Sequence, residues 1–499
     1  MTDSASYESQ RSLSRVVGVP LADLALSLGS PEPIESVSVT GASDDSRTVM
    51  PGDLYVALPG THVHGLDFEI EAFERGAVAV LSDRVSTVLP TIVVADPRRS
   101  AGPVCARIHR YPADTMDMYG VTGTNGKTST ALLLAAGLAA SGEVVGTMTG
   151  IGLQGPLTSV PTARTTPEAA TVQRTLGRFR DEGATAVAVE VSSHAVSEHR
   201  VDGVRFAAVG FTNLGPDHLD YHGSMDEYFA AKAELFAADR TAVAAVGIDD
   251  VHGRRLARLV DVPCWTWSAA DPRADVVGEN IECTDADTSM TVRTPLGSLH
   301  IRLPLLGPHQ ASNALTALAV ALAAGKGLES VAAGFERVRS VPGRLERIDA
   351  GQSFLALVDY MHNTAGQRSL LPFVRSLVPG RVIVVVGATG ERDPGKRFPL
   401  GATAAALADV VIVSDESPLS EDADVIRRAV ADGARAARSA VVMVEPDRRA
   451  ALALAVHTAG PGDVVVVAGR GCDTEQVYGR EIVEFDDRVV LRELLSDIV

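Results

Sequence analysis

The sequence predicts an α/β protein with three domains: a small N-terminal α/β domain, a central domain on a mainly parallel sheet, and a C-terminal Rossmann-like α/β domain. Short runs of β-branched residues alternate with stretches rich in alanine and leucine along most of the chain, which is the order expected of strand–helix units. With 499 residues, 46% of them apolar, the chain is long enough for about three domains and can fill several cores. These proportions exclude a disordered or fibrous protein.

The strands and helices that support this fold are predicted in a regular order. The strands lie at residues 54–58, 77–81, 116–122, 186–190, 207–211, 354–359, 381–386, 410–414 and 463–468. Helices are expected at 131–140 and 313–324, because alanine and leucine favour helix. We place the N-terminal domain at residues 1–113, the central domain at 114–340 and the C-terminal domain at 341–499, which opens with a proline–glycine pair.

The charge of the chain limits its partners. Asp and Glu total 63 against 45 Lys and Arg, a net charge of −18, and such a surface repels phosphate backbones, so neither nucleic acid nor an anionic membrane is expected as a partner. No apolar run approaches the roughly 18 residues of a membrane span, and the polar first residues lack the apolar segment of a signal peptide. We therefore expect a soluble cytoplasmic protein whose partners are small molecules.

A glycine-rich loop carries the clearest chemical signal. Gly120, Gly126, Lys127 and Thr128 satisfy the pattern GxxxxGKT between a predicted strand and a predicted helix, the context that this phosphate-binding motif requires. Glycines let backbone N–H groups surround phosphate oxygens, the lysine adds a positive charge, and the threonine hydroxyl can ligate magnesium. The central domain is therefore predicted to be a P-loop ATPase domain. The loop residues expected to contact the nucleotide are Gly123, Asn125, Gly126, Lys127, Thr128 and Ser129.

The residue sequence of this loop resembles that of one protein family. Residues 122–130 read TGTNGKTST, which is similar to the loop of the Mur ligase family, ATP-dependent amide-forming enzymes of cell-wall synthesis. Further segments that resemble this family are VEVSSH at 189–194, TNLGPDHLDYHG at 212–223, YFAAK at 228–232, PGRLE at 342–346, DYMHN at 359–363, GERDPGKR at 390–397 and FDDR at 485–488.

Other segments resemble the MurE-type branch, which adds the third residue of the peptidoglycan stem. They are DSR at 45–47, PGDLYVAL at 51–58, TTP at 165–167 and HRV at 199–201. The resemblance implies a UDP-muramoyl dipeptide as the acyl substrate. The residues it implies around that substrate are Ser46, Arg47, Thr165, Thr166, Ser193 and Arg200.

The resemblance also implies a mechanism. ATP phosphorylates a substrate carboxylate, and an amine attacks the acyl phosphate to release ADP, phosphate and an amide. Because a carboxylate attacking ATP meets charge repulsion, the site needs cations and N–H donors. The residues implied as catalytic are Lys127, Glu190, His218, Lys232, Arg344 and Asp359. Contacts to ATP beyond the loop are expected from Asn313, Arg344, His362 and Asn363.

Magnesium is expected at Thr128, Glu190, His218 and Lys232. A hard carboxylate and an imidazole suit the ion, and we predict Glu190 and His218 at the ends of adjacent strands near the loop. A helix-facing ion pair for Glu190 and an ordinary loop histidine at His218 are the alternatives. Composition alone favours a solvated surface charge for Lys232, whereas the resemblance implies a lysine carbamylated by carbon dioxide that supports the ion.

Two segments that the resemblance implies for selection of the incoming amine differ from the family's sequence. Members that add meso-diaminopimelate carry D-N-P-R, whereas residues 415–422 read DESPLSED, so that after one inserted residue Leu419 replaces the arginine. Arginine binds a carboxylate through two parallel hydrogen bonds, and leucine makes none. The family's G-K-G-H-E reads GRGCD at 469–473, which shortens its glutamate to Asp473. The residues expected around the amine are Arg392, Asp415, Ser417, Leu419, Gly469 and Asp473.

Three functions remain open from the sequence. The first is a MurE-like ligase that joins an amine other than meso-diaminopimelate to a UDP-muramoyl dipeptide. The second is an amide ligase of specialised metabolism with a different acyl substrate. The third is an ATP-binding subunit without catalysis, which the intact loop and its partner residues argue against.

Overall fold

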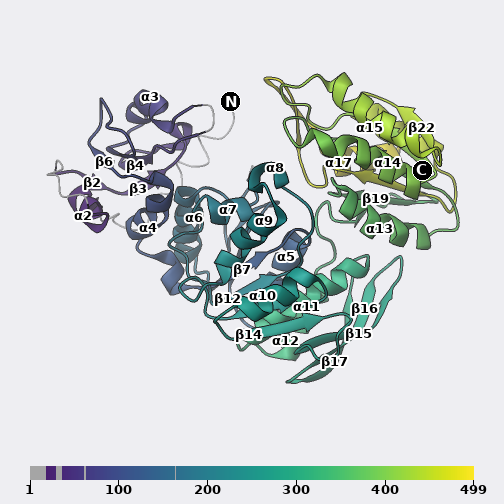
Figure 1. The fold of residues 1–499 in the computed structure, drawn as a ribbon, viewed down its shortest axis with the longest axis horizontal. Helices are drawn as coiled ribbons and strands as arrows, with labels where there is room; N and C mark the ends of the chain where they lie inside the picture. Colours follow the sequence, from purple (N-terminus) through teal and green to yellow (C-terminus); the bar gives the residue numbers. More distant parts are fainter. Residues whose placement is uncertain (1–17, 30–35, 61–62, 163, 499) are drawn as a thin grey trace.

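The structure is a computed structural model that describes residues 18–29, 36–60, 63–162 and 164–498. Residues 1–17, for which the sequence predicts no signal peptide, lie outside it. Three main sheets of four, eleven and six strands follow one another along the chain, at the left, centre and right of Figure 1. This arrangement confirms the predicted α/β fold class. We propose that the domains divide near residues 113 and 340, where the chain passes from one sheet to the next.

The first sheet is small and parallel. Its part of the chain contains β1 (Val19–Pro20), α2 (Leu21–Ser27), β2 (Ser38–Val39), β3 (Gly41–Ser43), β4 (Asp53–Val56), α3 (Glu69–Glu74), β5 (Ala79–Ser82), β6 (Thr91–Val93) and α4 (Pro97–Ile108). Strands β3 to β6 lie in chain order, all parallel, and β1 pairs with β2 beside them. Apolar residues of α2, α4 and the strands share one core, which fixes these helices on the sheet.

The second sheet forms the middle of the molecule. Its elements are β7 (Asp117–Thr122), α5 (Lys127–Ala140), β8 (Val145–Thr149), β9 (Gly152–Gln154), β10 (Ser159–Val160), α6 (Ala169–Asp181), β11 (Ala186–Glu190), α7 (Ser193–Ser197), β12 (Ala208–Phe211), α8 (Leu219–His222), α9 (Met225–Ala233), β13 (Ala244–Gly247), α10 (Val251–Leu259), β14 (Cys264–Ser268), β15 (Val276–Cys283), β16 (Thr288–Thr294), β17 (Gly297–Leu303), α11 (Pro308–Ala323) and α12 (Leu328–Phe335).

The strand order of this sheet is β10-β9-β8-β11-β7-β12-β13-β14-β15-β16-β17, parallel from β8 to β15 and antiparallel at both ends. Neighbouring residues of β7 point to opposite faces: Tyr119 and Val121 join the core under α5, α11 and α12, whereas Met118 joins the core under α6, α7, α9 and α10. Helix α6 also packs on α4, which attaches the first sheet to the second. Strand β7 therefore ends in the middle of the sheet, between two helical layers.

The third sheet is the Rossmann-like part. Its elements are β18 (Glu346–Arg347), β19 (Leu355–Asp359), α13 (Thr364–Ser376), β20 (Val382–Val386), α14 (Arg397–Leu407), β21 (Val410–Val413), α15 (Ala423–Ala437), β22 (Val441–Val444), α16 (Arg448–Thr458), β23 (Val464–Ala468), β24 (Glu475–Tyr478), β25 (Glu481–Glu484) and α17 (Asp487–Ser496). The order is β18-β19-β23-β20-β21-β22, parallel except for β18. Helices α13 to α15 cover one face, and α16 and α17 the other.

Most predicted elements match the observed ones closely. The strand predicted at 186–190 coincides with β11, and the other predicted strands differ by one or two residues at one or both ends. The helix predicted at 313–324 begins five residues earlier, at Pro308, because proline suits the first turn of a helix. The antiparallel strands β15 to β17 were not predicted, although β16 alternates buried and half-buried residues as a strand does.

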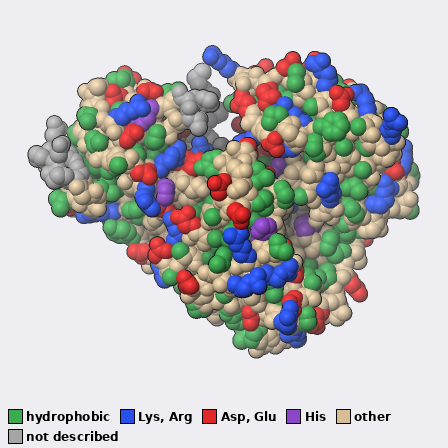
Figure 2. All heavy atoms as spheres, in the orientation of Figure 1, with side chains coloured by type: hydrophobic (Ala, Val, Ile, Leu, Met, Phe, Trp, Pro, Cys, Tyr) green, Lys and Arg blue, Asp and Glu red, His purple; other side chains and the backbone are tan. Residues whose placement is uncertain are grey.

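The surface of the molecule carries side chains of both charges. On the face drawn in Figure 2, acidic and basic side chains are interspersed. Within the described ranges, no helix combines the length and the apolar character needed to cross a membrane.

Candidate active site

The glycine-rich loop lies between the end of β7 and the start of α5, where the sequence predicts it. Gly123 and Gly126 have φ angles of +145° and +87°, which side chains rarely tolerate. A Cβ atom added at Gly123 would overlap the hydroxyl of Thr212, and one added at Gly126 would overlap the side-chain oxygen of Asn313. Both glycines are therefore required by close neighbours, and Asn313 of α11 lies against the loop.

A polar segment after β12 holds the loop from the side. The Thr212 hydroxyl donates to the Asn125 carbonyl at 2.7 Å, and the Asn213 amide donates to the same oxygen at 3.1 Å. In return the Asn125 backbone N–H donates to the Asn213 side chain at 3.1 Å. No role was predicted for Thr212 or Asn213. Their position just after β12, the strand beside β7, is the signal that could have identified them.

Two lysines converge on the carbonyl groups of the loop. The Lys127 ammonium donates to the Thr124 carbonyl at 2.9 Å, and Lys232 donates to the Gly123 carbonyl at 2.8 Å. Lys232 is only 1% exposed, with its nitrogen 4.6 Å from the centre of the Tyr228 ring. Burial, and then the charge of Lys127, lower the pKa of Lys232 far below its ordinary value. The surface position that composition favours for Lys232 is wrong, because it lies on the inner side of α9.

Glu190, at the end of β11, lies beside the first turn of α5. Its carboxylate accepts a hydrogen bond from the Thr128 hydroxyl at 2.9 Å and one from the Gly150 backbone at 3.0 Å. Arg344, from the segment that enters the third domain, donates to the same Thr128 hydroxyl at 3.2 Å. The structure therefore brings Thr128, Glu190 and Arg344 together, and within the described residues Glu190 forms no ion pair of the kind that the alternative reading required.

His218 does not lie as the sequence predicts. Strand β7 separates β11 from β12, so the strands before Glu190 and His218 are not adjacent. His218 follows β12 by seven residues, with an exposed side chain, and its ring centre is 4.8 Å from that of His194. The linear sequence could not predict this, because strand order is set by crossover connections. Among the described residues, no group of three or more His, Cys, Asp or Glu side chains is placed to hold a metal ion.

Asp217 joins the second domain to the third and received no role from the sequence. Its carboxylate is 3.8 Å from the His218 ring nitrogen and 4.0 Å from that of His362. Burial opposes its ionisation, yet the two imidazoles and Lys127 outweigh this effect and hold the pKa of Asp217 below its ordinary value. The Asp217 carboxylate therefore lies between side chains of the second and third domains, and its distances to them would change if the two domains closed.

The third domain places three of its predicted residues next to this junction. The Asp359 carboxylate accepts hydrogen bonds from the backbone N–H groups of Leu345 and Met361, both at 2.7 Å, and burial raises its pKa to about 6. His362 approaches Asp217, and Asn363 caps α13 through a hydrogen bond from the Gly366 N–H at 2.8 Å. Asp359 therefore holds two backbone segments in place: the one at Leu345, where the chain enters the third domain, and the one at Met361, just after β19.

The residues expected around the acyl substrate fall into two groups. Thr166, Ser193 and Arg200 lie together: Arg200 donates to the Thr166 carbonyl at 3.3 Å, and the Ser192 N–H next to Ser193 donates to the Thr166 hydroxyl at 3.1 Å. Thr165 adjoins them. Ser46 and Arg47 lie apart, in the first domain. Ser46 donates to Glu71 at 2.7 Å, and the exposed Arg47 pairs with Asp45 at 2.7 Å.

Most residues expected around the amine follow the carboxyl ends of the third sheet's strands. Asp415 pairs with Arg427 at 2.6 Å, and the Ser417 hydroxyl accepts from the Val477 N–H at 3.2 Å. Leu419 has a φ of +56° and donates its N–H to the Val477 carbonyl at 3.0 Å. Gly469 follows β23, Asp473 is exposed beyond it, and Arg392 is exposed on the loop after β20. Within the described residues, Asp415 is the only residue of this set that forms an ion pair.

A buried ion pair supports these loops from below. Arg448 and Asp487, both 0% exposed, are joined by two hydrogen bonds of 2.7 Å, and Arg448 also donates to the Asp415 carbonyl at 3.3 Å. Removing one partner would leave a buried charge without compensation.

We expect Arg448→Met to lower the free energy of unfolding of this domain by about 3–5 kcal/mol, measured by urea denaturation. The exposed pair Arg449–Glu493 is the control, since Arg449→Met should cost about 0–1 kcal/mol. Equal losses in both variants would contradict the prediction.

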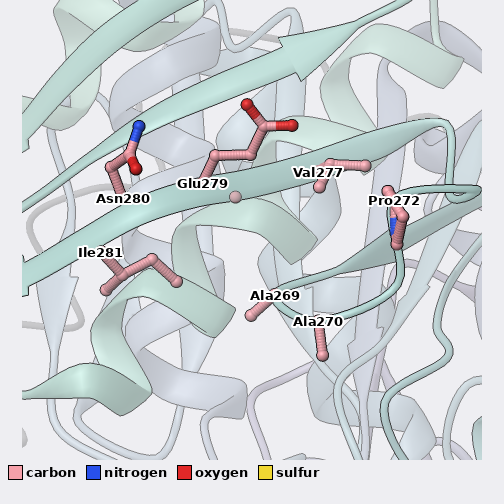
Figure 3. Close-up of a pocket in the computed structure, with 8 residues that line it drawn as sticks. Ala269, Ala270, Pro272, Val277, Glu279, Asn280 and Ile281 are labelled. Atoms are coloured by element: carbon pink, nitrogen blue, oxygen red, sulfur yellow. The ribbon is translucent and has the colours of Figure 1, made fainter.

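A hollow of about 390 Å³ lies away from these residues, between β14 and β15. In Figure 3 the Glu279 carboxylate points away from Ala269 and Ala270, and Glu279 pairs with Arg293 at 3.2 Å. Its lining offers no nucleophile, so we assign it no chemistry.

Comparison with known proteins decides the family. Three family models match the chain: the Mur ligase family catalytic domain over residues 38–109, the Mur ligase middle domain over 121–321, and the Mur ligase glutamate ligase domain over 343–471. A Streptomyces coelicolor protein named UDP-N-acetylmuramoyl-L-alanyl-D-glutamate–2,6-diaminopimelate ligase is 42% identical over 496 residues, covering 97% of each chain. This chain is a Mur ligase.

Further relatives place this Mur ligase near the MurE-type branch. A UDP-N-acetylmuramyl-tripeptide synthetase of Leifsonia xyli is 40% identical, covering 92% of this chain and 93% of its own. A solved structure of a UDP-N-acetylmuramoyl-L-alanyl-D-glutamate–2,6-diaminopimelate ligase superposes with a TM-score of 0.66 at 28% identity, covering 97% of this chain and 99% of its own. The predicted family, its MurE-like branch and the activity class, an ATP-dependent amide-forming ligase, are thereby confirmed.

Proposed function

We propose that this Mur ligase uses ATP to activate the carboxylate of a UDP-muramoyl dipeptide and joins it to an amino acid other than meso-diaminopimelate. The names of its relatives support the acyl substrate. The observation that carries the choice of amine is Leu419, an apolar side chain at the position where the resemblance implies an arginine. Without that guanidinium, the second carboxylate of diaminopimelate lacks its bidentate partner.

The loop residues fit ATP as the substrate that supplies phosphate. Lys127 lies at the start of α5, where the helix N-terminus adds positive potential, and its ammonium now rests on a backbone carbonyl that phosphate oxygens can replace. Arg344 reaches Thr128 from the third domain, so it can neutralise charge on the transferred phosphate. With Asp217 and His362 on either side of the same junction, domain closure would exclude water that otherwise hydrolyses the acyl phosphate.

Magnesium fits the oxygen atoms beside the loop. Thr128 and Glu190 offer a hydroxyl and a carboxylate 2.9 Å apart, which are hard ligands of the kind this ion prefers. When bound, magnesium would neutralise negative charge on the phosphates. We propose these two residues as ligands. His218, exposed and facing other rings, is proposed as a ligand only after closure brings its loop inward.

We further propose that Lys232 is carbamylated. Burial, and then the charge of Lys127, lower the pKa of Lys232, which favours the neutral amine, the form that attacks carbon dioxide. The reaction joins the amine nitrogen to the carbon of CO₂ and releases one proton, which turns a neutral amine into an anionic carbamate. Beside Lys127 and near Glu190, such an anion would attract magnesium instead of repelling it.

The amine is tested by measuring ADP release with ATP, magnesium, UDP-MurNAc-L-Ala-D-Glu and a panel of amines that includes meso-diaminopimelate and L-lysine. We expect turnover with an amine that lacks a second carboxylate, and a kcat/KM at least about tenfold lower for meso-diaminopimelate. In Leu419→Arg, the value for meso-diaminopimelate should rise, whereas Leu419→Met should not change it. Preference of the unmodified enzyme for meso-diaminopimelate would show that the specificity argument is wrong.

The panel also separates the other two functions. No turnover with any amine, together with intact ATP binding, would favour an acyl substrate from specialised metabolism. ATP binding without ADP release for any carboxylate substrate would favour a subunit without catalysis. The presence of Lys127, Thr128, Glu190 and Lys232 argues against that outcome.

A further inference from the structure

Four charged side chains form a closed ring where the first domain packs on the second. Arg98 contacts Glu198 at 3.1 Å and Glu168 at 3.4 Å. Arg200 contacts the same two carboxylates, Glu198 at 2.8 Å and Glu168 at 3.2 Å. The four side chains are between 11% and 25% exposed, so most of this charged ring is shielded from water. Each cation therefore lies between two anions, and each anion lies between two cations.

The first domain contributes one member of the ring. Arg98 lies in the first turn of α4, and it also donates to the Pro59 carbonyl of the same domain at 3.1 Å. The other three belong to the second domain: Glu168 directly precedes α6, and Glu198 and Arg200 follow α7. These three helices lie next to one another in Figure 1, and α4 packs on α6. Arg98 is therefore the member through which the first domain acts on the other three.

The ring is joined to the residues that we expect around the acyl substrate. Arg200 is itself one of them, and it donates to the carbonyl of Thr166, two residues before Glu168. The Thr166 hydroxyl in turn donates to the backbone carbonyl of Glu190 at 2.8 Å. The orientation of the Arg200 guanidinium is thus set by the two carboxylates on one side and by the Thr166 carbonyl on the other.

The charges of the ring cancel only when Arg98 is present. Burial raises the pKa of Glu198, but the charges of Arg200 and then Arg98 outweigh burial and hold this pKa below its ordinary value, so the carboxylate stays ionised. Arg164 also contacts Glu168, but its side chain is half-exposed, where an ion pair contributes little. Without Arg98, two carboxylates would face Arg200 alone. The net negative charge would then repel an anionic substrate.

We infer that Arg98 is a positioning residue for the acyl substrate, because it holds and neutralises the carboxylates that orient Arg200. The sequence indicates no role for Arg98, which lies in another domain, about 100 positions before Arg200 in the chain. The inference rests on the proposed function, because it takes the surroundings of Arg200 as the site of a UDP-muramoyl dipeptide. It also implies that this site is complete only when the first domain is packed on the second.

The test measures binding of UDP-MurNAc-L-Ala-D-Glu to the full-length enzyme by calorimetry, with ADP and magnesium present and no amine. We expect Arg98→Gln to weaken this binding about tenfold and to leave binding of ADP, measured separately, unchanged. The double variant Arg98→Gln with Glu198→Gln removes one charge of each sign, so it should bind the dipeptide more tightly than Arg98→Gln alone. The control is Arg107→Gln on the same helix, which should change neither ligand because Arg107 contacts Asp23 within the first domain.

The outcomes separate this inference from the proposed function. No binding of the dipeptide to the unmodified enzyme would reject the proposed acyl substrate, and the inference with it. Binding that is unchanged in Arg98→Gln, equal weakening of dipeptide and ADP, or a further loss in the double variant would overturn the inference alone. Melting temperatures identify a variant that does not fold. In that case Arg98→Lys, which keeps the charge but not the planar fork, replaces Arg98→Gln with an expected loss of about two- to fivefold.

Discussion

Replacement of Lys127 by alanine is expected to abolish ligation. The ammonium at the start of α5 is the charge that the loop directs at the phosphates, and loss of such a charge from phosphoryl transfer typically costs about 10³-fold or more in rate. Stability should change little, because the side chain is only half-buried and its ammonium donates to the Thr124 carbonyl, a bond that water can replace. The measurement is ADP release with saturating ATP and amine, together with thermal unfolding.

A matched lysine serves as the control for that experiment. Lys326 pairs with Glu143 at the far end of α5's layer, away from the loop, so Lys326→Ala should keep its ligase rate. Near-normal turnover in Lys127→Ala would reject the assignment of this loop to the phosphates. Equal losses in both variants would mean that the assay reports folding instead of chemistry.

Lys232→Ala should lose about 10²–10³-fold in rate and recover part of it when formate or acetate is added. The substitution removes the side chain from a fully enclosed position between Tyr228 and the Gly123 carbonyl, which leaves space for a small carboxylate. Such an anion can take the place that we propose for the carbamate. The measurement is ADP release at increasing carboxylate concentration.

Lys232→Met separates this role from simple packing. Methionine fills the same space without a charge, so its activity should be low and should not respond to added carboxylate. A carbon-13 NMR signal that appears when the unmodified enzyme is given labelled bicarbonate, and is absent in Lys232→Met, would support the carbamate directly. Full activity of Lys232→Ala without any additive would show that the residue has only a structural role.

Local patterns were sufficient where neighbouring residues in the chain act together. The loop from Gly120 to Thr128 needs only a strand before it and a helix after it, and both are recorded in the sequence by β-branched and alanine-rich runs. The predicted strand 186–190 ends at Glu190, and the observed strand does too. The same local record explains why the fold class, the family and the ligase class were predicted correctly.

Local sequence patterns could not predict contacts between segments that are distant in the chain. Lys232 has alanine neighbours that suit a surface, yet packing turns its side of α9 inward against Gly123. His218 was expected next to Glu190, but the crossover order places β7 between their strands. Asp217 gains its importance only from His362, 145 residues away in the chain, which no periodicity records.

By itself, the sequence of this protein determined the α/β fold, the phosphate loop and membership of the Mur ligase family, because each depends on residue types at short, fixed spacings. Tertiary structure alone decided which side chains are buried without partners. The buried Glu416 side chain, whose Oε1 has no hydrogen-bond partner among the described residues, fits only because Gly387 and Gly469 directly follow two strands that pair after folding. Burial and hydrogen bonding are properties of a residue's surroundings, and in this protein those surroundings come from segments far apart in the chain.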